Sequence, residues 1–356
     1  MNTLPLTAAQ EILITTVKVL VFFGVLLGIF SGMTYVERRM LAFMQFRLGP
    51  NRTGPFGLLQ PIADGIKLFF KEEFMPQGAQ PFLFLAAPAV AVITAFLAIA
   101  VVPYGGSITM PTWDSLPAWL AGREIPLQIA DLDVGVLYIF AITSLGVYGI
   151  VMAGWAAGNK YALIGGLRSS AQMFSYELAL GLSWVGVILL AGSLKLDDIV
   201  NAQNGPWGAL QWYCVLQFPA FIVYVIAATA EVNRTPFDLP EAETELVAGF
   251  HTEYSSMRFA LLQMAEYVNM ITVAAIGTNL FLGGWLSPVP FLPDGIVWFL
   301  LKMAAVLFYF IWLRGTLPRL RYDQLMHFGW KTLVPVATVW VLVTAGAIAF
   351  WERTPR

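Results

Sequence analysis

The sequence predicts an all-α, polytopic membrane protein with about eight transmembrane helices and an amphipathic interfacial helix in its first cytoplasmic loop. Of its 356 residues, 58% are hydrophobic and 12% are charged, whereas a soluble domain carries about 25% charged residues. Long apolar stretches recur along the chain, and Lys and Arg gather in every second connection between them. Such a chain must turn most of its surface toward lipid or other subunits, which predicts a single transmembrane domain over 1–356.

Eight apolar stretches come close to the roughly 20 residues that a helix needs to cross the bilayer core. Backbone polar groups in lipid need partners within their own segment, so we expect helices, and no alternating pattern of a membrane β-barrel appears. Met1–Glu11 holds no Lys or Arg, so we expect the first span to stay in the mature protein. The expected spans are 12–35, 82–102, 134–157, 173–191, 213–230, 259–282, 297–313 and 333–351.

The basic residues are divided unevenly between the two sides that these spans define. Fourteen lie in the odd-numbered connections and four on the opposite side. Because Lys and Arg accumulate in cytoplasmic loops, we expect the odd connections in the cytoplasm and both termini in the periplasm. The fourteen are Arg38, Arg39, Arg47, Arg52, Lys67, Lys71, Lys160, Arg168, Arg234, Arg258, Arg314, Arg319, Arg321 and Lys331. The four are Arg123, Lys195, Arg353 and Arg356.

The first connection contains a segment, 56–74, whose apolar residues recur at helical spacing. Leu58, Ile62, Ile66 and Phe69 alternate in this way with polar residues, which predicts an amphipathic helix too polar to span the bilayer. A surface helix without any role is the alternative.

A cytoplasmic loop over 231–258 is rich in carboxylates. A helix beginning near Pro240 would place three of its acids on one face, where repulsion and desolvation raise the pKa of neighbouring carboxyls. Interleaved Phe237, Leu239 and Leu246 argue against a freely solvated acidic loop, which is the alternative. The six acids are Glu231, Asp238, Glu241, Glu243, Glu245 and Glu253, and the three on one face are Asp238, Glu241 and Glu245.

Two carboxylates fall inside expected spans. Glu266 lies in the sixth span and Glu177 in the first turns of the fourth. A charge at the bilayer centre costs roughly 2.5–3.5 kcal/mol on insertion scales, so an intramembrane carboxylate indicates function by default. A structural pair with a neighbouring group is the alternative. Lys18 and Lys302 also lie in spans, but a lysine can extend to the interface, and we take both as structural.

The end of the first span concentrates polar groups beside aromatic ones. Glu37, Arg38 and Arg47 surround Phe43 and Phe46, an arrangement that can hold a polar headgroup whose tail lies in the bilayer. A cytoplasmic anchor of positive charge explains the arginines equally well.

The chain carries no recognisable redox centre of its own. Cys214 is the single cysteine and His251 and His327 are the only histidines, too few for a Cys-ligated iron–sulfur cluster or a protein-only metal site. We expect no metal. A net charge of −2 gives no support to a nucleic-acid partner, and no Gly-rich phosphate loop appears.

Several long motifs follow one another through nearly the whole chain. They are Glu37-Arg-Arg with Gly-Pro-Asn51, GLLQPIADGIKLFFKE from Gly57, RSSAQMFSYE from Arg168, AEVNRTPFDLPEAETELVAGFHTEYS from Ala230, AEY from Ala265, GGW from Gly283 and PRLRYDQLM from Pro318. Together these motifs resemble one family, that of the H subunit of bacterial respiratory complex I, the proton-translocating NADH–quinone oxidoreductase.

The resemblance implies an enzyme subunit of the bacterial inner membrane that helps form a quinone chamber with two hydrophilic subunits. It also implies that quinone is the substrate, that flavin and iron–sulfur clusters belong to partner subunits, and that small membrane subunits and lipid are neighbours. A chain of carboxylates would couple quinone reduction to proton translocation. The implied proton-relay acids are Glu177, Glu231, Asp238, Glu241, Glu243, Glu245, Glu253 and Glu266; the implied quinone-binding residues are Glu37, Arg38, Arg47, Gln60, Asp64 and Lys67.

The third span departs from some members of the family, which carry an acid there. The segment 141–157 has none, so a proton route along it would need water or hydroxyls such as those of Thr143, Ser144 and Tyr148. Three alternatives compete with the quinone enzyme: a related subunit of membrane-bound hydrogenases, a stand-alone ion transporter, and a structural anchor.

Overall fold

The computed structural model describes residues 7–110, 119, 122–239 and 243–353, and for 243–244 and 352–353 it describes the backbone alone. Seven helices in this part of the chain are long and apolar enough to cross a bilayer. They are α1 Ala8–Met44, α3 Pro81–Ile99, α4 Gly135–Ala156, α5 Lys160–Ala191, α10 Ser256–Phe281, α11 Ile296–Thr316 and the C-terminal pair α12 Tyr322–Phe328 with α13 Val334–Arg353, joined by the π-helix η4 Gly329–Leu333. The prediction of an all-α polytopic membrane protein is confirmed.

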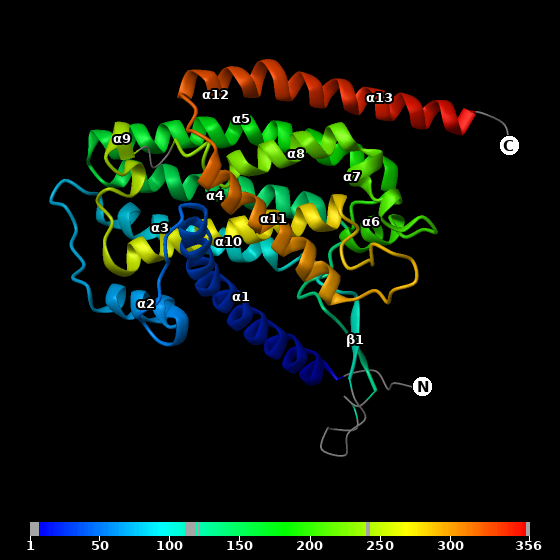
Figure 1. Ribbon diagram of the computed structural model, residues 1–356, viewed down its shortest axis with the longest axis horizontal. Helices are drawn as coiled ribbons and strands as arrows, with labels where there is room; N and C mark the ends of the chain where they lie inside the picture. Colours follow the sequence, from blue (N-terminus) through cyan, green and yellow to red (C-terminus); the bar gives the residue numbers. More distant parts are fainter. Residues whose placement is uncertain (1–6, 111–118, 120–121, 240–242, 354–356) are drawn as a thin grey trace.

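The helices form one bundle, in which α5 lies directly beneath α12 and α13 and α10 runs nearer the middle (Figure 1). Helix α5 packs against α4, α13 and α8, Phe218–Glu231, while α10 packs against α3 and α11. Tyr176 and Phe281 lie completely buried in the core between them. In Figure 1, α1 and α11 cross the other helices obliquely.

The fourth span begins thirteen residues earlier than expected, at Lys160 instead of 173. Asn159 caps it, because its side chain accepts a hydrogen bond from the Tyr161 amide at 3.0 Å, and Gly192 ends it in a left-handed conformation (φ 67°). A Cβ at Gly165 would stand 2.9 Å from the Gly249 Cα. This close approach brings the 3₁₀ turn η3, Gly249–His251, directly onto α5.

The fifth expected span, 213–230, is interrupted. It consists of α7, Tyr213–Leu216, and α8, with a break at Gln217. Pro219, near the start of α8, has no amide hydrogen and favours the break. At the break, the Gln217 side chain accepts from Trp340 Nε1 at 2.5 Å and donates to Thr344 Oγ1 at 3.3 Å, both on α13.

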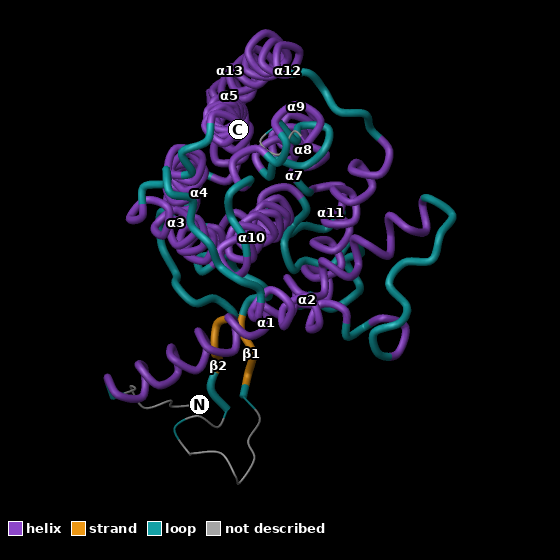
Figure 2. Tube along the Cα trace, turned by 90° about the vertical axis from the view of Figure 1, so that its left-hand side faces the viewer, coloured by secondary structure: helices purple, strands orange, loops and turns teal. Residues whose placement is uncertain are grey.

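The amphipathic segment forms a helix, α2, Gln60–Phe70, preceded by the 3₁₀ turn η1, Pro55–Gly57. It is shorter than the expected 56–74. It lies against α1 and α10 outside the bundle (Figure 2), and none of its residues is buried. Ile62, Phe69 and Phe70 are exposed, as an interfacial helix requires.

Short elements complete the described chain. The antiparallel strands β1, Ser107–Thr109, and β2, Glu124–Pro126, were not expected. Helix α6, Leu196–Ala202, and the 3₁₀ turn η2, Gly208–Gln211, follow α5. Helix α9, Glu243–Leu246, is a single turn.

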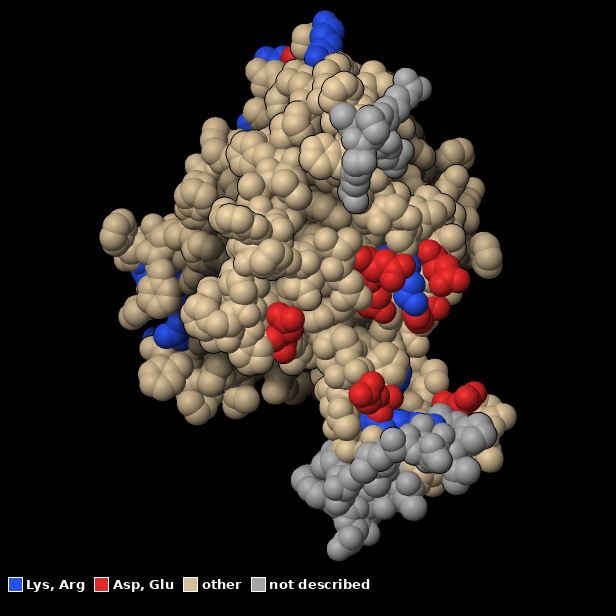
Figure 3. Space-filling model, turned by 90° about the vertical axis from the view of Figure 1, so that its right-hand side faces the viewer, with Lys and Arg blue, Asp and Glu red and all other residues tan. Residues whose placement is uncertain are grey.

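The two ends of the bundle differ in charge. Helix α1 begins and α13 ends near α6, opposite to α2 and α9 (Figure 1). On the α6 end, three aspartates interact with Lys195 and a fourth lies beside one of them, and Figure 3 shows groups of Asp and Glu on a largely uncharged surface. Burial and the neighbouring Asp131 raise the pKa of Asp197. The four are Asp131, Asp133, Asp197 and Asp198.

This asymmetry makes the orientation testable with single cysteines in a Cys214→Ser background. Lys71→Cys, beside α2, and Asn201→Cys, on α6, are both at exposed positions. Because basic loops stay in the cytoplasm, we expect a membrane-impermeant maleimide to label Lys71→Cys only in inside-out vesicles and Asn201→Cys only in spheroplasts. Labelling of Lys71→Cys from outside would reverse the orientation.

Candidate functional site: a buried charge cluster and the acids around it

Two carboxylates and two guanidinium groups from four parts of the chain meet inside the bundle. Glu37 comes from α1, Arg234 from the turn after α8, Glu266 from α10 and Arg314 from the end of α11. Arg234 Nη1 lies 3.1 Å from Glu37 Oε1 and its Nε 3.1 Å from Glu266 Oε1. Arg314 also pairs with Glu37 Oε1. Tyr267 donates to Glu37 Oε2 at 2.6 Å, and its ring lies 4.5 Å from the Arg234 guanidinium carbon.

This charge cluster is electrically balanced and shielded from solvent at its centre. Glu37 is 3% exposed and Arg234 6%. Burial alone would lower the pKa of Arg234, but Glu266 and Glu37 raise it above its ordinary value, so the guanidinium stays charged. Removing one member of a buried ion pair typically costs about 3–5 kcal/mol, so each charge in the cluster constrains the others.

The turn that presents Arg234 is held from α5 by a glutamine. Gln172 Nε2 donates to the carbonyls of Ala230 and Phe237, each at 2.8 Å. Between these two points the chain turns tightly, with Asn233 left-handed (φ 53°) and the Phe237 amide bonded to the Arg234 carbonyl at 2.8 Å. One side chain thus fixes both ends of the turn and, with it, the position of the guanidinium.

A small cavity connects the charge cluster to the first acid of the loop. Glu266 and Glu231 both line it, together with Asn233 and Asn269, and its volume is about 40 Å³. Most of its wall is apolar, but the cavity is large enough for a water molecule, which these carboxylate and amide groups could bind. Glu231 is 8% exposed, and its Oε2 has no hydrogen-bond partner among the described residues. This carboxyl is therefore buried beside the cavity without an ion pair or hydrogen bond at Oε2 in the described structure.

Glu177, on α5, lies beside Glu231, close enough for their charges to interact. It is 7% exposed. Its Oε1 accepts a hydrogen bond from Ser144 Oγ on α4. The structure thus brings three acids predicted from sequence, Glu177, Glu231 and Glu266, into one interior region.

The remaining loop acids lie nearer the surface and pair separately. Glu245 forms an ion pair with Arg168 at 2.7 Å, Asn159 Nδ2 donates to Glu253 at 2.7 Å, and Asp238 stands 4.0 Å from Arg319. Glu241 lies outside the described residues, and so does the side chain of Glu243.

The expected acidic helix face needs correction. Asp238 precedes α9, a single turn that ends at Leu246, and is not on a common helix with Glu245. The following Val247 is left-handed (φ 67°), which stops the helix, and the buried Phe237 and Leu239 draw the preceding chain into the core instead.

The expected quinone-binding residues divide into two groups. Arg38 and Asp64 form an ion pair at 2.6 Å, and Gln60 donates to Asp64 at 3.0 Å. These three join the end of α1 to α2. Lys67 is exposed on the next turn of α2, while Arg47 Nε donates to Gln45 at 2.7 Å. Glu37, by contrast, points into the charge cluster and not toward α2.

Sequence reasoning missed three residues of this site. Arg234 and Arg314 were counted only as basic residues of cytoplasmic connections, and Tyr267 was noted only within a motif. Arg234, Arg314 and Glu37 all lie just beyond the cytoplasmic ends of expected spans, which was the available signal. Nothing in the sequence indicates that they approach one another, because 197 residues separate Glu37 from Arg234.

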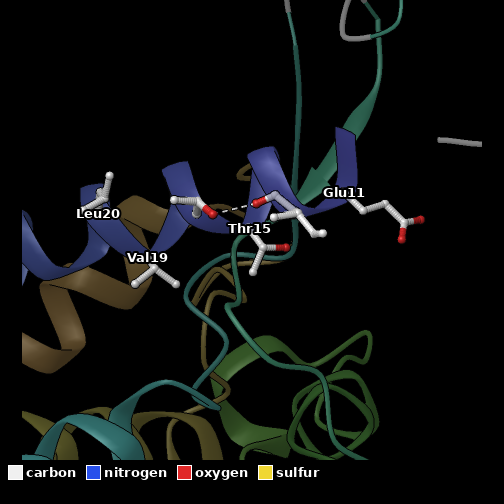
Figure 4. A pocket seen from close by; sticks show the side chains of 6 residues that line it. Glu11, Thr15, Val19 and Leu20 are labelled. Atoms are coloured by element: carbon white, nitrogen blue, oxygen red, sulfur yellow. Dashed lines mark hydrogen bonds between the residues drawn. The ribbon is translucent and has the colours of Figure 1, made fainter. Parts of the chain in front are cut away.

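Two other features do not form ligand sites. In the described part of the chain, no three His, Cys, Asp or Glu side chains gather as metal ligands. A shallow hollow lies on the opposite end of α1, lined by Glu11, Thr15, Val19, Leu20 and their neighbours. Figure 4 shows Glu11 extending away from the other helices. The Thr16 hydroxyl donates to the Ile12 carbonyl of the same helix at 2.8 Å, so this is an open helix surface.

Comparisons with known proteins point to a single family. The family model described as NADH dehydrogenase matches residues 17–345. The H 2 subunit of the NADH-quinone oxidoreductase of Geobacter sulfurreducens is 51% identical over 342 residues, covering 96% of this chain and 98% of the relative.

Relatives from other bacteria are about equally similar. The H subunit of the Rhodospirillum rubrum enzyme is 50% identical over 93% of both chains. That of Thermomicrobium roseum is 50% identical over 96% of this chain and 98% of its own. The match covers α1 to α13, including every member of the charge cluster. The chain belongs to the NADH dehydrogenase family, as an H subunit of NADH-quinone oxidoreductase.

Proposed function

We propose that this chain forms the membrane wall of a quinone chamber and passes protons from it through buried carboxylates. The observation that carries the proposal is the placement of two adjacent residues of α1. Arg38 faces α2 and pairs with Asp64, whereas Glu37 enters the charge cluster with Arg234. Because Glu37 and Arg38 are adjacent, a change of charge at the Arg38–Asp64 pair alters the electrostatic environment of the Glu37–Arg234 pair.

In this proposal Arg38, Asp64 and Gln60 hold the polar headgroup of the quinone, and the exposed apolar side of α2 keeps its tail in lipid. In this proposal Arg47 and Lys67 lie at the edge of the same headgroup site. Electrons reach the quinone from flavin and iron–sulfur clusters on partner subunits. This chain supplies orientation, charge and proton carriers.

The charge cluster links the headgroup site to the proton carriers. Arg234 bridges Glu37 and Glu266, so a shift of Arg234 toward one carboxylate weakens its hold on the other. Glu266 then exchanges protons with Glu231 across the shared cavity, and Glu231 with Glu177. The acids nearer the surface, Asp238, Glu245 and Glu253 with Glu241 and Glu243, supply protons from the cytoplasmic end.

The same geometry suggests how the subunit is oriented and partnered. The connection between α1 and α2 exposes Phe46 completely and Phe56 by 70%, although both have a left-handed backbone. Bulky residues adopt that conformation rarely. We assign this surface to contact with the hydrophilic quinone-site subunits. In a bacterial inner membrane this end faces the cytoplasm and both termini face the periplasm.

One alternative has support of its own. Glu37 and Glu266 are both ion-paired, and ion pairs that join four chain segments could serve only to anchor them. The two views differ in whether the carboxylates must titrate, which the substitutions below decide.

The headgroup site is tested by Arg38→Ala and Asp64→Asn in the assembled enzyme. Losing either partner of the pair removes orientation at the headgroup, so we expect quinone reductase activity to fall at least about tenfold. Electron transfer from NADH to an acceptor that reacts at the flavin should be preserved. Arg321→Ala, at an exposed arginine on the same end of the bundle, is the control. Equal loss of both activities would mean failed assembly and would contradict a role at the quinone.

The relay is tested by Glu266→Gln, which keeps shape and hydrogen bonding but removes the titratable carboxylate. We expect assembly to survive while proton pumping and coupled quinone reductase activity fall at least about tenfold, as loss of a proton-transfer group predicts. Glu266→Asp should retain part of both. Glu11→Gln, at an exposed acid of α1, should change neither. A Glu266→Gln enzyme that pumps at the normal proton-to-electron ratio would leave the anchor as the better account.

A further inference from the structure

Helix α4 carries no carboxylate but contacts one through a hydroxyl. Between Gly135 and Ala156 there is no Asp or Glu. Of the three hydroxyls that sequence reasoning named on this helix, Tyr148 is 57% exposed. Within the described chain, Ser144 is the one of the three that hydrogen-bonds to an acid, Glu177 on α5.

The Ser144 hydroxyl has two acceptors for its single hydrogen. Its Oγ lies within hydrogen-bond distance of Glu177 Oε1 and also 2.8 Å from the carbonyl oxygen of Phe140, one turn earlier. A hydroxyl donates one hydrogen bond and accepts others. The Ser144 hydroxyl therefore cannot donate fully to the Glu177 carboxylate and to the Phe140 carbonyl at the same time.

We propose that Ser144 is a positioning residue whose hydroxyl reverses its hydrogen bond each time Glu177 gains or loses a proton. With Glu177 ionised, Ser144 donates to Oε1. When Glu177 takes up a proton, the new carboxyl O–H donates to Ser144 Oγ, and the serine hydrogen turns to the Phe140 carbonyl. No proton leaves serine in either direction; only the hydrogen bonds change.

This reversal gives a buried acid a partner in both protonation states. Glu177 is 7% exposed, and a buried polar group left without a partner costs roughly 1–3 kcal/mol. A group that can only donate would serve the ionised form but could not accept the O–H of the protonated one. Because Ser144 can do either, the side chain of Glu177 stays in place while its charge changes beside Glu231. The inference rests on the proposed function, since it gives that relay a means of holding one of its acids.

Helix α4 offers a matched control at the next position. Thr143 Oγ1 donates to the same Phe140 carbonyl, at 3.0 Å, and is half-buried like Ser144. Its hydroxyl contacts no carboxylate in the described structure. Both hydroxyls can therefore donate to the Phe140 carbonyl of their own helix. Of these two residues, Ser144 alone contacts Glu177.

The experiment uses the whole enzyme in liposomes and compares Ser144→Ala, Ser144→Thr, Thr143→Val and Glu177→Gln. Two quantities are measured: quinone-coupled proton pumping, and the infrared carbonyl band of protonated Glu177, assigned by its loss in Glu177→Gln. We expect Ser144→Ala to move the band to higher wavenumber, because the carboxyl loses its acceptor. Pumping should fall roughly tenfold, as for one hydrogen bond to a charged group.

Ser144→Thr keeps the hydroxyl and should restore both band and pumping, whereas Thr143→Val should alter neither. An unchanged band in Ser144→Ala, with pumping lost in Glu177→Gln, would overturn this inference alone. Normal pumping by Glu177→Gln would overturn the relay role of Glu177 and the inference with it.

Discussion

The double ion pair of Arg234 with Glu37 and Glu266 is the contact on which the rest of the interior depends. The elements that it joins, α1, the turn after α8 and α10, come from distant parts of the sequence. Buried charges tolerate little displacement, because each needs its counterion at contact distance. The hold of Gln172 on the turn, the Tyr267 bond to Glu37 and the second arginine from α11 all serve to keep this one guanidinium in place. The small cavity lined by Glu266 and Glu231 lies beside this fixed charge, and a water molecule bound there would have a fixed position.

A protein that converts electron transfer into proton movement needs groups that respond to charge without unfolding. In the proposed relay, the balance of charge within the cluster holds the helices together, while Glu266 at its edge exchanges protons with the neighbouring Glu231 and, through it, with Glu177. Neither Glu231 nor Glu177 forms an ion pair with the arginines of the cluster. Glu231 lines the cavity that Glu266 also lines, and Glu177 lies beside Glu231 on α5. In this interior, some carboxylates form ion pairs with arginine and others do not. In a surface loop, water would hydrate every carboxylate in the same way.

The pattern of apolar and polar residues along the sequence predicted those features that depend on neighbouring residues alone. The apolar stretches predicted the seven long spans, because burial in lipid requires length and hydrophobicity, and the amphipathic spacing predicted α2. Pro219 was a local sign of the interruption at Gln217, but the partners of the Gln217 side chain, Trp340 and Thr344, could not be predicted because only the fold brings them there. Among the site residues, Glu266 and Glu177 stood out because a charge in an apolar run is costly anywhere. Arg314 and Tyr267 did not, because their importance arises from the fold that brings them to Glu37.

The broken fifth span has a consequence for the order in which the chain is built. Gln217 is synthesised more than a hundred residues before its partners on α13, so during insertion its amide and the interrupted backbone enter the membrane without them. The Gln217 amide is therefore satisfied only once α13 has been made and has packed against the bundle. A chain truncated before α13 would leave this amide without Trp340 and Thr344.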